Sequence, residues 1–488
     1  MSVILVSNRV ADPDPTQPVQ GGLAAALLQA VTASGAAWVG TRVQSSASDR
    51  AEPLASVVQA GAGSIARVEF PTELYRQFYG GFANSALWPV LHSRPDLVRT
   101  NDEQYAAYCD VNRQMALALK RFIKPNSKIW VHDYHFLTVA KELRDLGVTC
   151  PVGFFLHTPF PQRVKFTGLP HHRELANAML HYDLLGFQTA DDQANFTNYV
   201  DRELRLPVDP SGFIATTATR LGSFPIGIDV QSFVESSIRA AARPETARLR
   251  ASLQTGALAI GVDRIDYSKG LRNRLRAFDQ LFQTHPDMKR KISLLQIALP
   301  SRSEIETYSR LQNDIATLVS DINGRHGEVD WMPIRYLNKG YPQSRLAGLY
   351  RTAQIGLVTP LVDGMNLVAK EYVAAQNPLN PGVLILSEFA GAARQLDAAL
   401  LVNPNDIDAV VRAVCQALTM DLSERRERFE AMIAGLKRDD IHSWYDGFLA
   451  TLTAAPAAQT APFRKTASRS TLSALIPNPF GLATAKSS

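Results

Sequence analysis

The sequence is poor in cysteine and has no long apolar run, and both absences exclude classes of protein. Three cysteines occur in 488 residues, widely spaced and without a Cys-x-x-Cys pair, so neither a disulfide framework nor a thiolate metal site is expected. We expect Cys109, Cys150 and Cys415 to be small buried apolar residues. No apolar run approaches the roughly 18 residues that cross a membrane, so we expect a soluble protein without a membrane partner.

The N-terminus also lacks the features of a secretory signal. The apolar run at residues 3–6 is short and leads directly into Ser7-Asn8-Arg9, with no basic lead and no small-residue cleavage site. A cytoplasmic location is therefore expected.

The excess of positive charge is confined to the C-terminal tail. The formal net charge is +5, but residues 454–488 contain Arg464, Lys465, Arg469 and Lys486 and no acidic residue. The rest of the chain is nearly neutral, so the basicity does not predict a nucleic-acid partner. The tail is rich in Pro, Ala, Ser and Thr, a composition typical of disordered segments.

Short β-branched apolar runs alternate with longer stretches of helical spacing, a pattern that predicts an α/β fold with parallel sheets. At 488 residues the chain exceeds the size of a single core. We expect two Rossmann-like, doubly wound lobes with the active site in the cleft between them. The predicted strands are 3–7, 128–132, 152–156 and 183–187 in the first half and 258–262, 293–298, 355–359 and 383–387 in the second.

The boundary between the lobes is expected within residues 226–245, where the sequence PIGID at 225–229 and Pro244 interrupt the regular pattern. Near the C-terminus, residues 424–440 are charged and helical. The last helix has an aromatic face, formed by Trp444, Tyr445 and Phe448, that is able to dock on either lobe.

Ionisable residues gather directly after the predicted strands. In open α/β sheets, ligands bind outside the carboxyl ends of the strands. A single charged residue there is more often a loop salt bridge or a helix cap, but here the feature recurs in both halves. The residues are Arg9, Asp133, His157, Arg264 with Lys269, and Arg302. This recurrence favours a site between the lobes.

The stretch 355–372 carries the strongest local signal. A buried strand leads into Asp363-Gly364-Met365-Asn366-Leu367 and then into a helix that carries Glu371. Gly364 permits close backbone approach to a diphosphate or a sugar, and the two carboxylates suit sugar and ribose hydroxyls. Gly21-Gly22, before an Ala/Leu-rich helix, fits a similar anion-binding role and fits a simple turn equally well.

Basic side chains offer an alternative to a metal ion. Arg264 and Lys269 together are able to neutralise a leaving diphosphate, the role that a divalent cation takes in other transferases. No HExxH motif and no set of three ligands accompanies His132-Asp133-Tyr134-His135. Asp12-Pro13-Asp14 lies in a sequence typical of an extended turn. No metal ion and no cofactor are expected.

Long, specific segments follow one another through residues 1–453. They are SNRV with GGL, YGGFANSALWPVLHSRPDLV, HDYH, GFFLHTPFP, LLGFQT, DRIDYSKG, and LVTPLVDGMNLVAKEYVAAQ with GVLILSEFAGAA. In this order they resemble the trehalose-6-phosphate synthase family of retaining B-type glycosyltransferases. The resemblance implies a metal-independent transfer of glucose from UDP-glucose to glucose 6-phosphate, giving α,α-trehalose 6-phosphate and UDP. The resemblance does not indicate whether the protein forms a homo-oligomer.

The resemblance also implies a division of the chain. Residues 1–228 would form the acceptor-binding lobe and residues 229–440 the nucleotide-sugar-binding lobe. A last helix at 441–453 would pack back on the first lobe, followed by the disordered basic tail at 454–488.

The family motifs assign roles to individual residues. The acceptor would contact Arg9, Tyr79, Trp88, Asp133 and Arg302, with the arginines on its phosphate. The donor would contact Gly21, Gly22, Arg264, Lys269, Tyr341, Asp363, Gly364, Met365, Asn366, Leu367, Val368, Ala369, Lys370 and Glu371. The implied catalytic residues are Asp133, His157, Arg264, Lys269 and Asp363, with His157 beside the donor sugar. The leaving phosphate would itself accept the proton of the acceptor, so no enzymic nucleophile is needed.

Two positions depart from the family pattern. Thr41 stands where the family usually has a second Trp, and Thr158 stands where it commonly has Ile. Because position 158 is near the acceptor, Thr158 is expected to affect acceptor selectivity together with Trp88. The alternatives are a glucosylglycerol-phosphate synthase using ADP-glucose and glycerol 3-phosphate, a pseudo-glycosyltransferase for aminocyclitol phosphates, and a non-catalytic sugar-phosphate sensor.

Overall fold

The fold is described from a computed structural model, which covers residues 2–12, 24, 27–28, 31–32, 35–44, 55–253, 256–302 and 304–455. Gly21, Gly22, Asp14 and residues 456–488 of the predicted tail lie outside the described residues. Residues 1–458 form one compact unit. No helix in the described part of the chain combines the length and the apolarity needed to cross a membrane.

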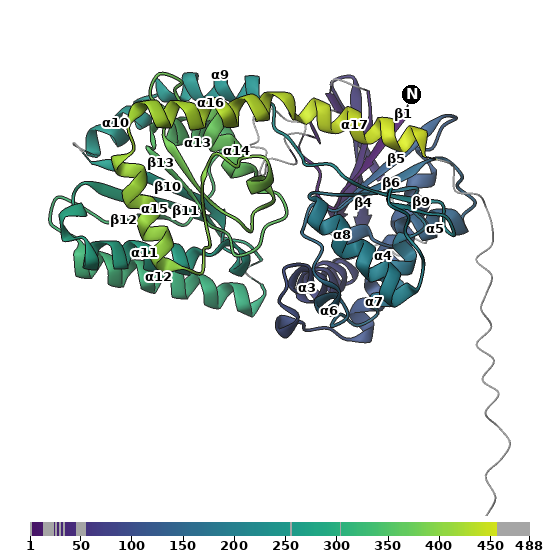
Figure 1. The fold of residues 1–488 in the computed structure, drawn as a ribbon. Helices are drawn as coiled ribbons and strands as arrows, with labels where there is room; N and C mark the ends of the chain where they lie inside the picture. The colour runs from purple at the N-terminus through teal and green to yellow at the C-terminus, as the bar shows by residue number, and fades with distance from the viewer. Residues whose placement is uncertain are drawn as a thin grey trace, which may run out of the picture. The chain divides into compact units, whose positions relative to one another are not determined.

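The first half of the described chain builds a sheet of nine strands, in the order β3-β4-β2-β1-β5-β6-β7-β9-β8 (Figure 1). The strands pair in parallel except at the two edges, where β3 and β8 are antiparallel to their neighbours. Their bounds are β1 Ser2–Val6, β2 Ala37–Val43, β3 Ala55–Ala60, β4 Gly63–Phe70, β5 Ser127–His132, β6 Val152–Phe155, β7 Leu184–Phe187, β8 Phe213–Ile214 and β9 Thr219–Ser223.

Helical segments connect these strands. The α-helices are α2 Thr72–Tyr75, α3 Trp88–Leu91, α4 Asp102–Lys120, α5 Val139–Asp145, α6 Arg163–Phe166, α7 His172–Met179 and α8 Ala190–Tyr199. Two π-helical segments, η1 Arg76–Leu87 and η4 Val200–Leu204, and two 3₁₀ turns, η2 Pro95–Leu97 and η3 Tyr134–Phe136, are also present in the described part of this half.

The second half builds a six-stranded parallel sheet in the order β12-β11-β10-β13-β14-β15. Its strands are β10 Ala257–Arg264, β11 Ile292–Leu299, β12 Ile334–Leu337, β13 Ile355–Val358, β14 Val383–Ser387 and β15 Leu400–Val402. Its helices are α9 Val230–Ala241, α10 Pro244–Ser252, α11 Leu271–Thr284, α12 Glu306–His326, α13 Gln343–Thr352, α14 Leu367–Ala375 and α15 Ile407–Thr419, with 3₁₀ turns η5 Tyr267–Lys269, η6 Pro286–Met288 and η7 Gly391–Arg394.

All eight predicted strands are present, as β1, β5, β6, β7, β10, β11, β13 and β14. They are buried on both faces, which is why they read as continuous apolar runs. The three cysteines are only half-buried, contrary to the expectation that they are core residues. Cys109 in α4, Cys150 before β6 and Cys415 in α15 pack against the cores from their edges.

The last two helices, α16 Leu422–Arg438 and α17 Ile441–Ala454, return toward the first sheet (Figure 1). The ring of Phe448 stacks on Trp130 of β5 with 4.2 Å between centroids and an interplanar angle of 6°. A Cβ at Gly153 would lie 2.8 Å from the Phe448 ring, and one at Gly186 would lie 2.7 Å from it. Glycine at both positions therefore makes the space that Phe448 occupies.

The two stretches of chain that connect the halves touch each other. The amide of Ile441 donates to the carbonyl of Ile228 at 3.3 Å, and a Cβ at Gly227 would collide with the backbone of Asp439 and Asp440. Because both connections meet at this point, we take it as the junction of the two halves. The residue bounds of the domains stay predictions.

Candidate active site

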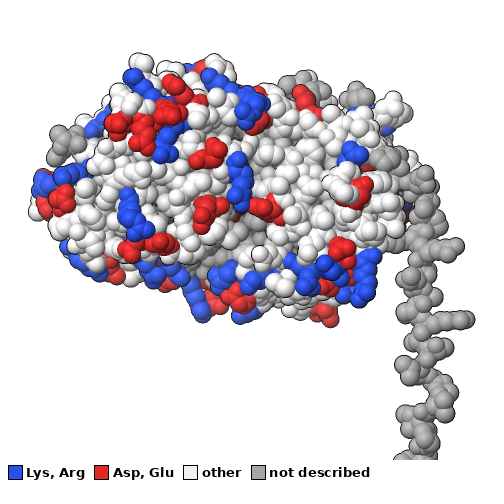
Figure 2. Space-filling model, viewed as in Figure 1, with Lys and Arg blue, Asp and Glu red and all other residues white. Residues whose placement is uncertain are grey.

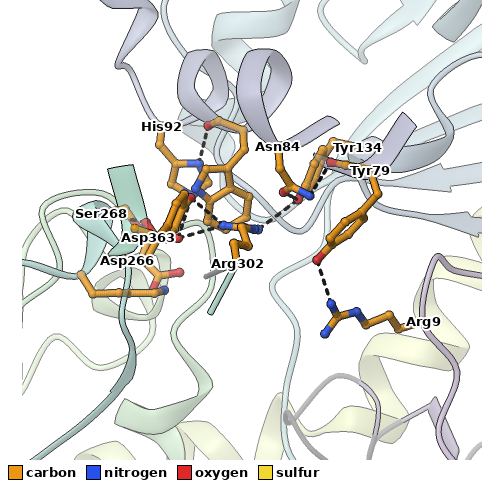
Figure 3. Close-up of polar contacts among 12 residues, drawn as sticks. Arg9, Tyr79, Asn84, His92, Tyr134, Asp266, Ser268, Arg302 and Asp363 are labelled. Carbon is orange, nitrogen blue, oxygen red and sulfur yellow. Dashed lines mark hydrogen bonds and ion pairs between the residues drawn. The ribbon is translucent and has the colours of Figure 1, made fainter. Parts of the chain in front are cut away.

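The predicted site residues come from the carboxyl ends of strands in both sheets, and several of them meet (Figure 3). Asp133 follows β5, His157 follows β6, Arg264 ends β10 and Arg302 follows β11. This arrangement is the one expected for a ligand site in α/β folds.

Arg302 links the two halves of the chain. Its Nη2 donates to the hydroxyl of Tyr134 at 3.2 Å, and the Tyr134 hydroxyl donates to Oδ1 of Asn84 at 2.8 Å. On the other side, Nη1 of Arg302 donates to Oδ2 of Asp266 at 3.0 Å and to the hydroxyl of Tyr308 at 2.8 Å. Figure 3 shows Arg302 between these two groups of partners. The guanidinium is thus held in one orientation by residues of both halves.

Trp88 forms an aromatic wall beside this guanidinium. The guanidinium carbon of Arg302 lies 4.0 Å from the centroid of the Trp88 ring, and that of Arg264 lies 5.5 Å from it. The ring of His92 packs against the Trp88 ring with 3.9 Å between their centroids. Nδ1 of His92 lies 2.9 Å from the Trp88 carbonyl oxygen. Burial lowers the pKa of His92 to about 4, so it is neutral and adds no competing positive charge.

A π-helical segment, η1, carries Tyr79 and ends at Leu87, so that Trp88 follows it directly as the first residue of α3. Asn84 and Ser85 each donate from the side chain to a carbonyl five residues earlier, at 2.8 and 2.7 Å. The small residues of this segment let the backbone widen, and π-helical turns are frequent at functional sites. The Tyr79 hydroxyl accepts from Nη2 of Arg9 at 2.9 Å (Figure 3).

Asp133 has a backbone conformation that non-glycine residues rarely adopt, with φ of 74°. Its amide donates to the Phe155 carbonyl at 2.8 Å, while its side-chain Oδ1 is buried and has no hydrogen-bond partner among the described residues. Burial raises the pKa of Asp133 to about 6, against the opposing effects of nearby backbone N–H groups and of Arg264 and Arg302. A carboxylate held in this way is suited to accept hydrogen bonds from sugar hydroxyls.

Several of the residues predicted to bind the donor lie around Asp363. Lys269 Nζ lies 2.5 Å from Oδ2 of Asp363, and Nδ2 of Asn366 donates to the same oxygen at 3.0 Å. Burial alone would raise the pKa of Asp363, but the adjacent Lys269 holds it below its ordinary value. The pair therefore presents an ionised carboxylate and an ammonium side by side.

The turn between Asp363 and α14 lies against the first half of the chain. A Cβ at Gly364 would lie 2.5 Å from the His157 carbonyl oxygen and within 2.8 Å of the backbone of Thr158 and Pro159. Asn366 adopts φ of 66° and caps α14 by accepting from the amide of Ala369 at 3.2 Å. The N-terminus of α14 consequently opens beside His157 and Thr158, where its amides favour an anion.

Glu371, one turn into α14, is buried and accepts from Nε2 of Gln343 at 2.8 Å. Burial raises its pKa to about 7. In the first turn of the same helix, Leu367 and Ala369 are buried and Val368 is half-buried.

Other predicted residues lie differently. The ammonium of Lys370 is buried and donates to the carbonyl of Ile226 and to Oε1 of Gln395, so its side chain is directed at the junction of the halves. Tyr341 lies 5.3 Å from the ammonium of Lys339. The buried hydroxyl of Thr158 has no partner within the described ranges, whereas the Thr41 hydroxyl donates to the carbonyl of Asn8 at 2.7 Å.

Sequence reasoning missed several residues of this network. Asn84, His92, Asp266 and Tyr308 were not singled out, and Tyr134 was considered only as part of a metal motif. The signal available for Tyr134 was its place two residues past β5, beside Asp133. Within the described residues, no group of three or more His, Cys, Asp or Glu side chains has an arrangement that would hold a metal ion.

Comparison with known proteins places the chain. Residues 8–454 match the family described as glycosyltransferase family 20. The chain belongs to glycosyltransferase family 20. A trehalose-6-phosphate synthase of Sinorhizobium fredii is 42% identical over 457 residues, covering 93% of this chain and 98% of that protein. The family resemblance predicted from the sequence is confirmed.

Solved structures of family 20 relatives have the same fold. An α,α-trehalose-phosphate synthase (UDP-forming) from Burkholderia xenovorans in complex with glucose-6-phosphate superposes with a TM-score of 0.89 at 41% identity, covering 93% of this chain and 100% of that one. An E. coli structure bound with UDP-2-fluoro glucose gives a TM-score of 0.87 at 38% identity, covering 93% and 99%. The predicted fold class, two Rossmann-like lobes of the B type, is confirmed.

Proposed function

We propose that this member of family 20 is a UDP-forming trehalose-6-phosphate synthase, which transfers glucose from UDP-glucose to glucose 6-phosphate with retention. The names of relatives about 40% identical over more than 90% of the chain agree with this activity. The observation that carries the proposal is the meeting, at one site, of Arg302 and Trp88 with the Lys269–Asp363 pair, since the reaction needs an acceptor phosphate and a donor diphosphate close together.

On the acceptor side, Arg9 and Arg302 bind the phosphate of glucose 6-phosphate. Arg302 supports this role because Trp88, Tyr134 and Asp266 fix its orientation, which preserves a planar fork for phosphate oxygens. The carboxylate of Asp133 accepts from a hydroxyl of the sugar, and Tyr79 and Trp88 form the apolar walls.

On the donor side, Arg264 and Lys269 stabilise the charge on the leaving diphosphate of UDP-glucose. Asp363 accepts from hydroxyls of the donor glucose, and the amides that begin α14 face the phosphate or the sugar. Glu371 accepts from the ribose diol. Since Lys269 and Asp363 are 2.5 Å apart, donor binding exchanges part of their mutual contact for contacts with the substrate.

Catalysis follows from positioning and charge stabilisation. The acceptor hydroxyl attacks the anomeric carbon on the face that the diphosphate leaves, and a phosphate oxygen takes its proton. His157 lies beside the donor sugar and donates a hydrogen bond to it. Thr158 and Trp88 set acceptor selectivity.

We also propose a cytoplasmic location and keep the domain bounds 1–228 and 229–440 as part of this proposal.

The experiment is nucleotide release by the purified protein, with UDP-, GDP- or ADP-glucose and with either glucose 6-phosphate or glycerol 3-phosphate, in the presence of chelator. Release with UDP-glucose and glucose 6-phosphate, and formation of a phosphorylated non-reducing disaccharide, are expected. Arg264→Ala should lower turnover at least 100-fold, while Arg310→Ala, on the exposed face of α12, should leave it unchanged. Release only with glycerol 3-phosphate and ADP-glucose, or no release at all, would overturn the proposal.

A further inference from the structure

A pair of buried histidines lies beside the turn that joins Asp363 to α14, the donor-side turn (residues 363–366). Nδ1 of His132, at the end of β5, is 3.1 Å from Nε2 of His157, which follows β6. Nδ1 of His157 is in turn 3.3 Å from Sδ of Met365, in the turn before α14. The three side chains form a line from the interior of the first sheet to the donor-side turn.

We propose that His132 is a positioning residue that holds the proton of His157 on Nδ1, the nitrogen facing the donor-side turn. The proposal rests on the proposed function for the placement of the donor sugar beside His157. It goes beyond that function because it assigns a role to a residue that touches neither substrate.

The direction of the hydrogen bonds follows from counting protons. A thioether sulfur has no proton and only accepts, so Nδ1 of His157 donates to Met365. A neutral imidazole carries a single N–H, so Nε2 of His157 is an acceptor. The contact between the two rings then requires Nδ1 of His132 to be the donor.

Both rings are neutral in this environment. Burial lowers the pKa of His157 to about 3. Burial also lowers the pKa of His132 well below its ordinary value, and the proximity of His157 lowers it further. The side chains of His132 and His157 are 0% and 3% exposed. Two neutral, single-proton rings leave one consistent arrangement, in which each donates from Nδ1.

The packing around His132 explains why it acts only through His157. The rings of Trp130 and Trp444 lie 4.6 and 6.1 Å from it between centroids, and its Nε2 has no hydrogen-bond partner in the part of the chain that the structure describes. Enclosed in this way, His132 has no path to a ligand. Its orientation depends on α17, which supplies Trp444, so the last helix contributes to the geometry of the donor site.

The chemical consequence concerns what the site offers to the sugar. With the proton on Nδ1, His157 offers a donor to a hydroxyl oxygen of the donor glucose, in place of the weak contact with Met365. With the proton on Nε2, the same position would offer only an acceptor, and Nε2–H would face Nδ1 of His132. A site built to hydrogen-bond a substrate loses much of its binding energy when a group that should donate a hydrogen bond can only accept one.

The test combines ¹⁵N NMR of histidine-labelled protein with kinetics. In the wild-type chain, the His157 signals, identified by their loss in His157→Gln, should show a protonated Nδ1 and an unprotonated Nε2. His132→Phe keeps a buried ring without a donor and should mix the His157 tautomers and lower kcat 10- to 100-fold with little change in KM for glucose 6-phosphate. His132→Asn, whose amide N–H replaces Nδ1–H, should restore the tautomer and most of kcat.

The control is His326→Phe, a buried histidine that pairs with Asp279 far from these rings in the sequence, and it should keep full activity. An Nε2–H tautomer of His157 in the wild-type chain would overturn the inference, whatever the activity of the variants. Equal losses of kcat in His132→Phe and His132→Asn would also overturn it. Failure of the proposed function would appear separately, as the expected tautomer in a protein without synthase activity.

Discussion

The guanidinium carbon of Arg302 lies 4.0 Å from the ring centroid of Trp88, although the two residues belong to different halves of the chain. Trp88 begins α3, directly after the π-helical segment η1 of the first half, and Arg302 follows β11 of the second. The proposed acceptor site is therefore shared between the halves, and its geometry depends on their approach.

Arg302→Lys tests this shared contact. Lysine keeps the charge but cannot hold Asp266, Tyr308 and Tyr134 with one planar group. Loss of a charge-assisted contact costs about 2–3 kcal/mol, so we expect KM for glucose 6-phosphate to rise roughly 30- to 100-fold, with UDP binding nearly unchanged. Steady-state kinetics and calorimetric titration with UDP provide the measurement. Arg310→Lys on α12 is the control, and an unchanged KM in Arg302→Lys would contradict the assignment.

The buried carboxyl group of Glu371 should make the stability of the protein depend on pH. Its pKa is raised from 4.5 to about 7 by burial, so it contributes stability that is fully present below pH 4.5 and is lost as the pH rises through about 7. Glu371→Gln should therefore raise the free energy of unfolding by about 1–3 kcal/mol at pH 8 and hardly change it at pH 4.5. Denaturant unfolding at both pH values measures the difference.

The same substitution should weaken donor binding, because an amide replaces the carboxylate proposed to accept from the ribose diol. A rise in Kd for UDP of about tenfold at pH 8 corresponds to one lost charge-assisted hydrogen bond. Stabilisation without any loss of UDP affinity would show that Glu371 does not contact the donor.

Gly364 predicts a steric effect on catalysis. A Cβ there would lie 2.5 Å from the His157 carbonyl oxygen and close to the backbone of Thr158, and backbone atoms cannot rotate away as a flexible side chain can. Gly364→Ala should lower kcat/KM at least 100-fold and destabilise the chain by about 1–3 kcal/mol. Gly324→Ala, in α12 with nothing near its Cβ, should instead stabilise slightly. Wild-type activity in Gly364→Ala would refute the close approach.

Substitution of Phe448 measures how much the docking of α17 stabilises the protein. The ring is fully buried against Trp130 and in the space left by Gly153 and Gly186, so Phe448→Ala should cost about 3–5 kcal/mol. The exposed Gly447→Ala, whose Cβ meets no neighbour, is the matched control on the same helix. Thermal unfolding of both variants checks the prediction, and equal melting temperatures would contradict the docking of α17.

The sequence was sufficient for the inner strands and for the residues that follow them. Strands buried on both faces appear as continuous apolar runs. By contrast, residues 57–59 of β3 are exposed, and β4 mixes buried apolar residues with half-buried polar ones, so neither reads as a continuous apolar run. The strand-end rule located Asp133, His157, Arg264 and Arg302, because it depends only on local order along the chain.

Contacts between distant segments could not be predicted in this way. Tyr134 and Arg302 are 168 residues apart, and no spacing rule relates them. The π-helical η1 was also missed, since its widened turns depend on side-chain bonds such as that from Asn84 to the Tyr79 carbonyl. Likewise the ammonium of Lys370 is directed to Ile226 at the junction, which its place in a donor motif does not reveal.

The docking of α17 also bears on how the chain folds as it is synthesised. Trp130, Gly153 and Gly186 leave the ribosome long before Phe448, and the face they form remains open until the last helix follows. At roughly 5–20 residues per second, this wait lasts on the order of tens of seconds. During that interval the first half exposes an aromatic surface that a chaperone would recognise, and a chain that ends before α17 would carry that surface permanently.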